Sequence, residues 1–152
     1  MSLHQDLAAR LVSIIDSWDG KPAGFAVARC YSVEQYIGKL PPEAPGMICV
    51  LASGVESERQ RSTDLDDITI GVVYLANLAD IDLATCDIHD THVDNLRTLL
   101  RQQQIVTLAS GKGCHRRSTG LPTPYDSERL RQNEIFVAVI ATTYHIGIEV
   151  VS

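Results

Sequence analysis

The sequence lacks any apolar run long enough to cross a membrane. A membrane-spanning helix needs roughly 18 or more consecutive apolar residues, and no segment of this 152-residue chain approaches that length. The N-terminus also lacks the apolar stretch of a secretory signal peptide. The sequence therefore predicts a protein without a membrane partner.

Positive charge is scarce as well. The chain has 13 Lys and Arg against 19 Asp and Glu, a formal net charge of -6. This balance argues against binding nucleic acid through bulk electrostatics. The 45% hydrophobic and 21% charged fractions exclude a disordered chain. The length fits one domain over residues 1–152.

Closely spaced cysteine pairs are also missing. None of the four cysteines forms a CxxC pair, so neither a disulfide framework nor a zinc ribbon is indicated. Cys30 and Cys49 lie in apolar, strand-like runs, where a free thiol behaves as a small hydrophobe. We therefore expect reduced thiols in a cytosolic protein.

Apolar spacing predicts two helices. Residues 3–18 carry an apolar stripe at 3–4 spacing that includes Leu7, Leu11, Ile14 and Trp18, and Gly20 and Pro22 follow it as stop signals. A second helix is expected from an N-cap at Asp90 or Thr91 to about residue 104. Its expected buried stripe consists of Val93, Leu96, Leu99 and Leu100. Residues 80–91 are expected to be irregular at their start.

Four strands are expected, at residues 25–31, 47–52, 68–75 and 135–151. The last is unusually long, because residues 136–150 contain no proline and one glycine. At about 3.3 Å per residue it would reach roughly 50 Å. The order of elements predicts an α+β fold with a mainly antiparallel sheet of about four strands and two helices packed on one face.

Two charged segments are candidate contact surfaces. Residues 54–67 are expected to form a mobile hairpin tip, and residues 110–120 a flexible basic loop. Residues 121–130, rich in proline, are expected to continue as a loop ending in a turn of helix. The predicted subunit or partner contacts are Glu56, Glu58, Arg59, Arg61, Lys112, Arg116 and Arg117.

Cys86, His89 and His92 are spaced three residues apart, so on a helix they could face one metal ion. Structural zinc sites normally have four ligands, and no second cluster completes this one. Asp87 and Asp90 between them are explained by their place near a helix N-terminus. We therefore predict no metal site. Stoichiometric zinc in the purified protein that is lost on mutation of His89 or His92 would contradict this prediction.

Nucleotide and catalytic motifs are not recognised either. The segment Gly111-Lys112-Gly113 lacks the Walker spacing and the Ser or Thr that follows its lysine. Cys114, His115 and Ser118 lack a third group that would orient the histidine. The sequence predicts no catalytic residue, no cofactor and no enzyme activity. An enzyme assembled from distant residues stays an alternative.

Three parts of the chain carry a resemblance to a known group. The first is Ala28-Arg29-Cys30-Tyr31, and the second runs from Glu58-Arg59-Gln60-Arg61 into the aspartate-led strand at residues 66–73. The third is the ending, from Tyr125-Asp126 through residues 128–136 to Thr142-Thr143-Tyr144-His145-Ile146. In these features the chain resembles the tail terminator and tail-completion (neck) proteins of long-tailed bacteriophages and prophages.

The resemblance implies a virion protein that forms a homo-oligomeric ring at the end of the tail tube. Its partners would be copies of itself, tail-tube proteins and head-completion proteins, first in the host bacterial cytoplasm and then in the virion. The group has no catalytic residues to transfer. A small adaptor or regulatory protein that binds one partner through a sheet edge is the alternative.

Overall fold

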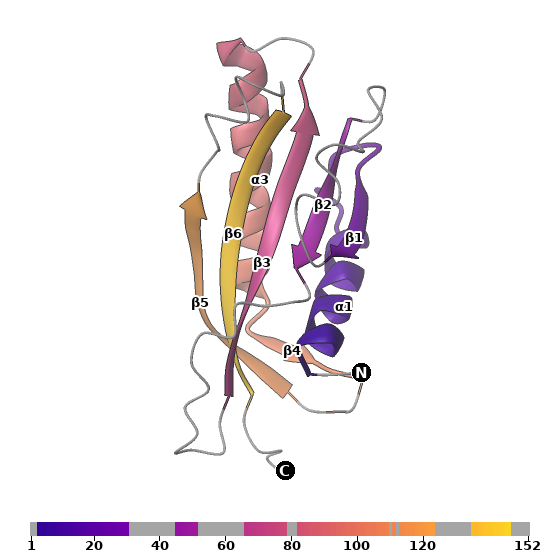
Figure 1. Cartoon of the computed structure of the whole chain (residues 1–152), viewed down its shortest axis with the longest axis vertical. Helices are drawn as coiled ribbons and strands as arrows, with labels where there is room; N and C mark the ends of the chain where they lie inside the picture. Colours follow the sequence, from indigo (N-terminus) through magenta and orange to yellow (C-terminus); the bar gives the residue numbers. More distant parts are fainter. Residues whose placement is uncertain are drawn as a thin grey trace.

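The computed structural model describes residues 3–30, 45–51, 66–78, 82–109, 111, 113–123 and 135–146. Within them the chain forms an α+β fold of two helices and a six-stranded sheet (Figure 1). In chain order the elements are α1 (Leu3–Asp16), β1 (Ala26–Cys30), β2 (Gly46–Leu51), β3 (Asp66–Asn77), α3 (Leu83–Gln102), β4 (Ile105–Thr107), β5 (Gly113–Thr123) and β6 (Ile135–Ile146).

The strands lie in the order β1-β2-β3-β6-β5-β4. β1 and β2 are parallel, and every other neighbouring pair is antiparallel. The prediction of a mainly antiparallel sheet is confirmed, whereas the prediction of about four strands is wrong. β4 and β5 are the additional strands, and β5 occupies much of the segment that was expected to be loop.

The centre of the sheet is the ladder between β3 and β6. The two strands pair over their full lengths of 12 residues each, from Asp66 opposite Ile146 to Asn77 opposite Ile135. The predicted long final strand is thus present from Ile135 to Ile146, and residues 147–152 lie outside the described part. At about 3.3 Å per residue the ladder is roughly 40 Å long.

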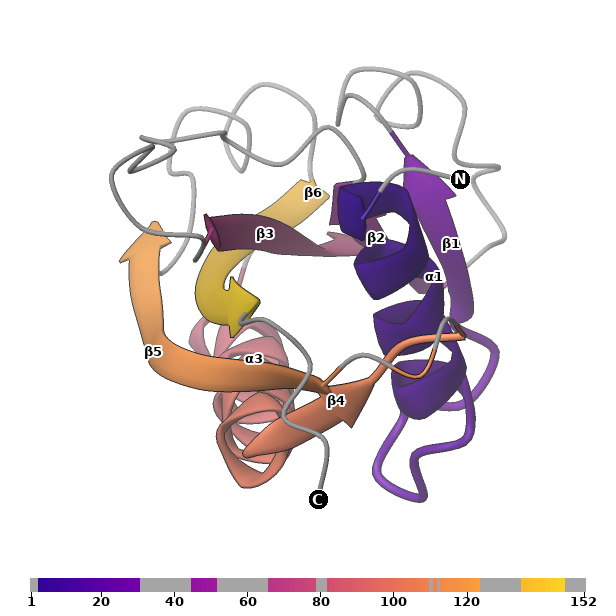
Figure 2. The same cartoon turned by 90° about the horizontal axis from the view of Figure 1, so that it is seen from below.

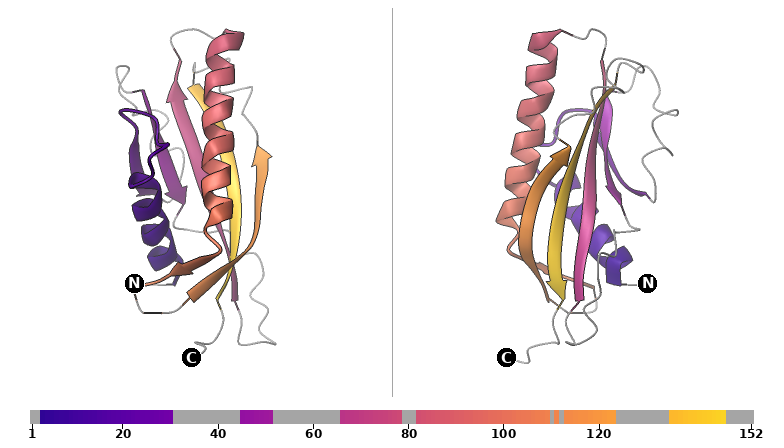
Figure 3. Two further views of the ribbon diagram at one scale, coloured as in Figure 1. Left: turned by 180° about the vertical axis from the view of Figure 1, so that it is seen from behind. Right: turned by 60° about the vertical axis from the view of Figure 1, so that its left-hand side comes forward.

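Both helices pack on one face of this sheet (Figure 3). Because side chains alternate along a strand, Ile70, Val72 and Tyr74 of β3 face the helices, with Ile68 packed beside them, as predicted. Val73 and Leu75 are buried on the opposite face, where they pack with residues of β2 and β6. β3 is therefore buried on both faces, as suits a central strand.

The helix α3 begins earlier than predicted. Asp82 is its N-cap, and the Asp82 carboxylate accepts a hydrogen bond of 2.7 Å from the backbone N–H of Thr85. Hydrogen bonds from the Thr85 side chain and backbone lower the pKa of this carboxyl. The expected N-cap at Asp90 or Thr91 is therefore wrong. The sequence did not indicate the first turns of α3, because they have no buried apolar stripe.

The sheet is strongly curled, so that β4 returns towards α1 (Figure 2). One hydrogen bond of 3.4 Å joins the two regions, from the backbone N–H of Ala109 to Oδ1 of Asp6. No helix in the described ranges is both long and apolar enough to span a membrane.

Leu11 tests the packing of α1 against the sheet. Its side chain is fully buried in the core that α1, α3 and the sheet share. We expect Leu11→Ala to lower the free energy of unfolding by about 2–5 kcal/mol, because it leaves a cavity. Urea denaturation would measure the loss. The exposed neighbour Ser13 supplies the control, since Ser13→Ala should change stability by less than about 0.5 kcal/mol.

Candidate functional site

Most of the predicted contact residues cannot be placed. Glu56, Glu58, Arg59, Arg61 and Lys112 lie outside the described residues. Arg116 and Arg117 are described, and they lie in the strand β5 rather than in the flexible loop that was expected. The prediction of a basic loop over residues 110–120 is therefore wrong for residues 113–120.

Arg116 and Arg117 have different surroundings. Arg116 lies opposite Tyr144 of β6 and is half-buried, and its Nη1 donates a hydrogen bond of 3.5 Å to Oγ1 of Thr119. Its Nε is buried and has no hydrogen-bond partner among the described residues. Arg117 falls at the register shift between Arg116 and Ser118, and its side chain is exposed. Such irregularities can re-aim a side chain, and of the two arginines Arg117 is the exposed one.

Threonine hydroxyls connect the strands around β6. Thr119 and Thr142 approach to 3.2 Å between their hydroxyl oxygens, and Thr142 also donates to the backbone carbonyl of Ser118 at 3.4 Å. On the other side of β6, the Thr69 and Thr143 hydroxyls are 2.8 Å apart. Cross-strand pairs of this kind stabilise a sheet. We therefore interpret the threonines as strand-pairing residues that hold β5 and β3 in register with β6.

The sheet has two different terminal edges. β1 pairs with β2 alone among the described strands. At the other end, β4 covers β5 only from Gly113 to His115. Within the described part of the chain no strand pairs with the outer side of residues 118–123, which we call the free edge of β5. In Figure 1 this edge and β1 stand on opposite sides of the molecule.

A polar cluster lies between α3 and the sheet. The hydroxyl of Tyr74 on β3 is 2.8 Å from Nδ1 of His89 and 3.1 Å from Nδ1 of His92, both on α3. We call these three residues the His–Tyr cluster. Tyr74 is fully buried and the histidines are half-buried. The sequence indicated the histidines by their spacing, but it gave no signal for Tyr74.

Aromatic rings surround this cluster. Phe25 lies 5.2 Å from the Tyr74 ring, and Phe136 lies 5.6 Å from the His89 ring, measured between centroids. Burial in this apolar setting lowers the pKa of His89, and the neighbouring His92 lowers it further. Burial also raises the pKa of the Tyr74 hydroxyl. Burial thus favours the neutral form of both the Tyr74 hydroxyl and the His89 imidazole.

The geometry gives the two histidines a partner other than a metal. Both Nδ1 atoms are directed at the Tyr74 hydroxyl, and Cys86 is half-buried against the core. The described residues contain no group of three or more His, Cys, Asp or Glu side chains that could hold a metal ion.

The cysteine and histidine of β5 do not face each other. Cys114 is buried and His115 is exposed, as expected for consecutive residues of a strand. Burial raises the pKa of the Cys114 thiol to about 11, with a smaller contribution from Asp6. A neutral thiol is a poor nucleophile, so this pair lacks the arrangement of a nucleophile and its base.

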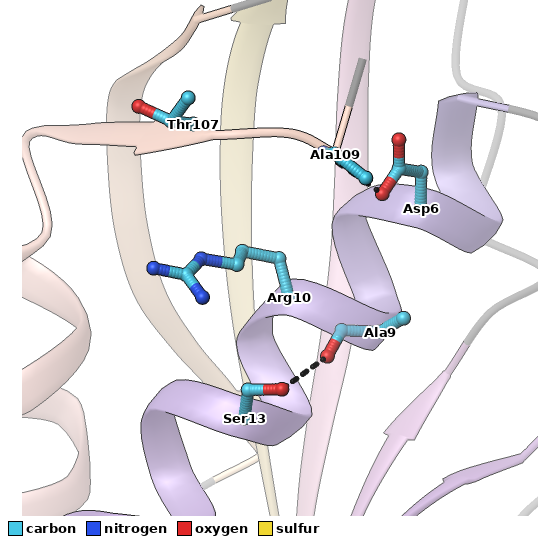
Figure 4. Close-up of a pocket in the computed structure, with 6 residues that line it drawn as sticks. All are labelled: Asp6, Ala9, Arg10, Ser13, Thr107 and Ala109. Atoms are coloured by element: carbon cyan, nitrogen blue, oxygen red, sulfur yellow. Dashed lines mark hydrogen bonds between the residues drawn. The ribbon is translucent and has the colours of Figure 1, made fainter. Parts of the chain in front are cut away.

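A shallow pocket separates α1 from β4 (Figure 4). It has a volume of about 250 Å³ and is lined by Asp6, Ala9, Arg10, Ser13, Thr107 and Ala109. Asp6 is engaged by the backbone of Ala109, and the Ser13 hydroxyl donates to the carbonyl of Ala9 at 3.3 Å. The hydrogen-bonding groups of the pocket are thus partly used within the protein, and no convergent set of catalytic groups lines it.

No protein-family model matches the sequence, and no curated protein matches it significantly.

Tyr74→Phe tests the energetic weight of the His–Tyr cluster. Removal of the hydroxyl leaves two half-buried imidazole nitrogens without their partner, so we expect a loss of about 1–3 kcal/mol in the free energy of unfolding at pH 7.5. Chemical denaturation would measure it. Tyr144→Phe is the matched control, because the buried Tyr144 hydroxyl makes no hydrogen bond of good geometry among the described residues, although burial raises its pKa and Thr142 lies near enough to offset part of that rise. A control that loses as much as Tyr74→Phe would contradict the assignment.

Proposed function

We propose that this protein is a structural subunit of a phage or prophage neck, a tail terminator or tail-completion protein that acts by forming a ring on the end of the tail tube. The observation that carries the proposal is the pair of unlike sheet edges, β1 and the free edge of β5. The resemblance in residues 28–31, 58–73 and 125–146 supplies the identity of the assembly. The mainly antiparallel α+β fold is compatible with it.

Two unlike edges favour a ring. An open edge presents unpaired backbone N–H and C=O groups that can pair with another chain. If β1 of one subunit meets β5 of the next, the interface joins two different patches, which is the heterologous contact required by cyclic rings of more than two subunits. Pairing of this kind would continue the sheet from one subunit to the next. The β3–β6 ladder would then lie in the middle of the six strands that each subunit contributes to the continuous sheet.

The charges at the β5 edge suit selective pairing. A charged residue on an edge strand discourages indiscriminate association. Arg117 is exposed at the register shift of β5, in a chain with a net charge of -6. A neighbour's acidic surface would complement it, and Glu56 and Glu58 are sequence-based candidates for that surface. Complementary charges mainly improve specificity and association rate.

The proposed work is assembly, without catalysis or a cofactor. It would take place in the host bacterial cytoplasm and end in the virion, with tail-tube and head-completion proteins as partners.

Arg117→Glu tests the ring interface. We expect wild-type protein to bind the ends of purified tail tubes of the matching phage and to stop their growth, and Arg117→Glu to bind several-fold more weakly. The fold should be retained, because exposed charges contribute little to stability. Electron microscopy would count capped tube ends. Arg10→Glu is the control, since Arg10 is an exposed arginine of α1 that faces the β4 side (Figure 4).

Arg116 is unsuitable for the same test. Its Nε is buried, so a carboxylate in its place would destabilise the fold and obscure a binding defect. The charge reversals Arg59→Glu and Arg61→Glu examine the other predicted contact segment.

A crosslinking experiment addresses the edges themselves. Ala26 of β1 and Ser118 of β5 are exposed, so Ala26→Cys with Ser118→Cys should give ladders of linked subunits under a short thiol crosslinker once rings form. The pair Ala26→Cys with Ser13→Cys should not. If the wild-type protein binds no tube ends and Ala26→Cys with Ser118→Cys gives no ladders under any condition, the ring proposal is wrong. The adaptor function would then take its place.

A further inference from the structure

Among the described residues, the first half of α3 makes few buried apolar contacts with the sheet. The buried residues of this helix are Val93, Leu96 and Leu100, all in its second half. In the first half Leu83 and Ile88 are exposed, at 79% and 55%. The inward-facing side chains there include His89 and His92, and their described hydrogen-bond partner is Tyr74. A segment with few buried apolar contacts opens at low cost in free energy.

The hydrogen bonds of the His–Tyr cluster depend on its protons. A tyrosine hydroxyl has one proton to donate and lone pairs that accept. It can therefore donate to one Nδ1 and accept from the N–H of the other. When both imidazoles are charged, both Nδ1 atoms are donors. The Tyr74 proton then has no acceptor in the cluster, and two positive rings lie 6.0 Å apart between centroids.

We propose that the His–Tyr cluster is an acid-sensitive latch, which holds the first half of α3 on β3 at neutral pH and releases it when both histidines are protonated. The second half of α3 stays in place through Val93, Leu96 and Leu100. The latch is independent of the proposed ring and of tail-tube binding.

Among the described residues, no group around the cluster compensates the positive charges. Tyr74 faces it from β3 and Phe136 faces it from β6, beside Phe25. The far end of β5, residues 121–123, contains no titratable side chain. On α3 itself, Cys86 is half-buried, and Asp87 and Asp90 are exposed. Among the described residues, no carboxylate is hydrogen-bonded to either imidazole, and Arg116 lies towards the other end of β6, opposite Tyr144.

The direction of the pH effect follows from His89. Because its pKa in the folded protein is lowered from 6.5, the open form binds a proton more readily than the latched form. The contribution to stability is complete above about pH 6.5 and is lost as the pH falls below that value towards the lowered pKa. The latch should therefore open in mildly acidic solution.

Amide hydrogen exchange, corrected for the intrinsic rate at each pH, tests the latch. Between pH 7.5 and 5.0 we expect residues 86–92 of the wild-type protein to lose protection by about tenfold or more, which corresponds to about 1.4 kcal/mol. Residues 96–101 should keep theirs. In His89→Asn with His92→Asn, which cannot acquire charge, the protection of residues 86–92 should be the same at both pH values. His115→Asn, which removes an exposed histidine of β5, should behave as wild type.

Equal protection of residues 86–92 at the two pH values in the wild-type protein would overturn the latch. So would a loss that persists in the double variant. If that variant does not fold, an NMR titration of the wild-type imidazoles decides. Opening of residues 86–92 must then follow the titration of His89, and opening at an unrelated pH would also overturn the proposal.

Discussion

The pairing of β3 with β6 is the constraint on which the rest of the structure depends. These two strands are far apart in sequence but adjacent along their whole lengths, and they carry β2 on one side and β5 on the other. Their helix-facing side chains form the surface on which α1 and α3 pack. Their opposite faces are buried as well. A slip of one residue in the register between β3 and β6 would move every side chain of the slipped strand to the opposite face of the sheet. Neither helix could then keep its contacts.

The ladder also explains why β5 is a strand at all. Its sequence contains Gly113, Gly120 and Pro122 and several polar residues, a composition typical of loops. The long edge of β6 supplies backbone partners from Cys114 to Thr123, and the Thr119–Thr142 contact supports the pairing. Proline is tolerated because β5 is an outer strand over this part of its length. Tertiary context thus overrides local preference here.

The sequence predicted an element wherever burial leaves a recognisable pattern of apolar residues. The stripe of α1 was predictable because one face of this helix packs against the core. The strands β3 and β6 were predictable from their runs of β-branched and aromatic residues. The start of α3 was not, since its first turns are exposed and are fixed by the Asp82 cap rather than by an apolar stripe. Among the candidate site residues, the histidine spacing was visible. Their hydrogen bonds to Tyr74 were not, because that contact is made between residues brought together only by the fold.

The elements that the sequence predicts well and those that it does not differ in how tightly they are packed. The segments that could be predicted from their pattern of apolar residues are those with the most buried apolar surface. Burial of apolar surface is the dominant favourable term in folding. The first half of α3 and the free edge of β5 lack such a pattern and depend on a few polar contacts. Polar contacts respond to charge and to new partners more readily than a packed core does. Responsiveness, whether to protons or to a neighbouring chain, is therefore expected at these two places and not along the β3–β6 ladder.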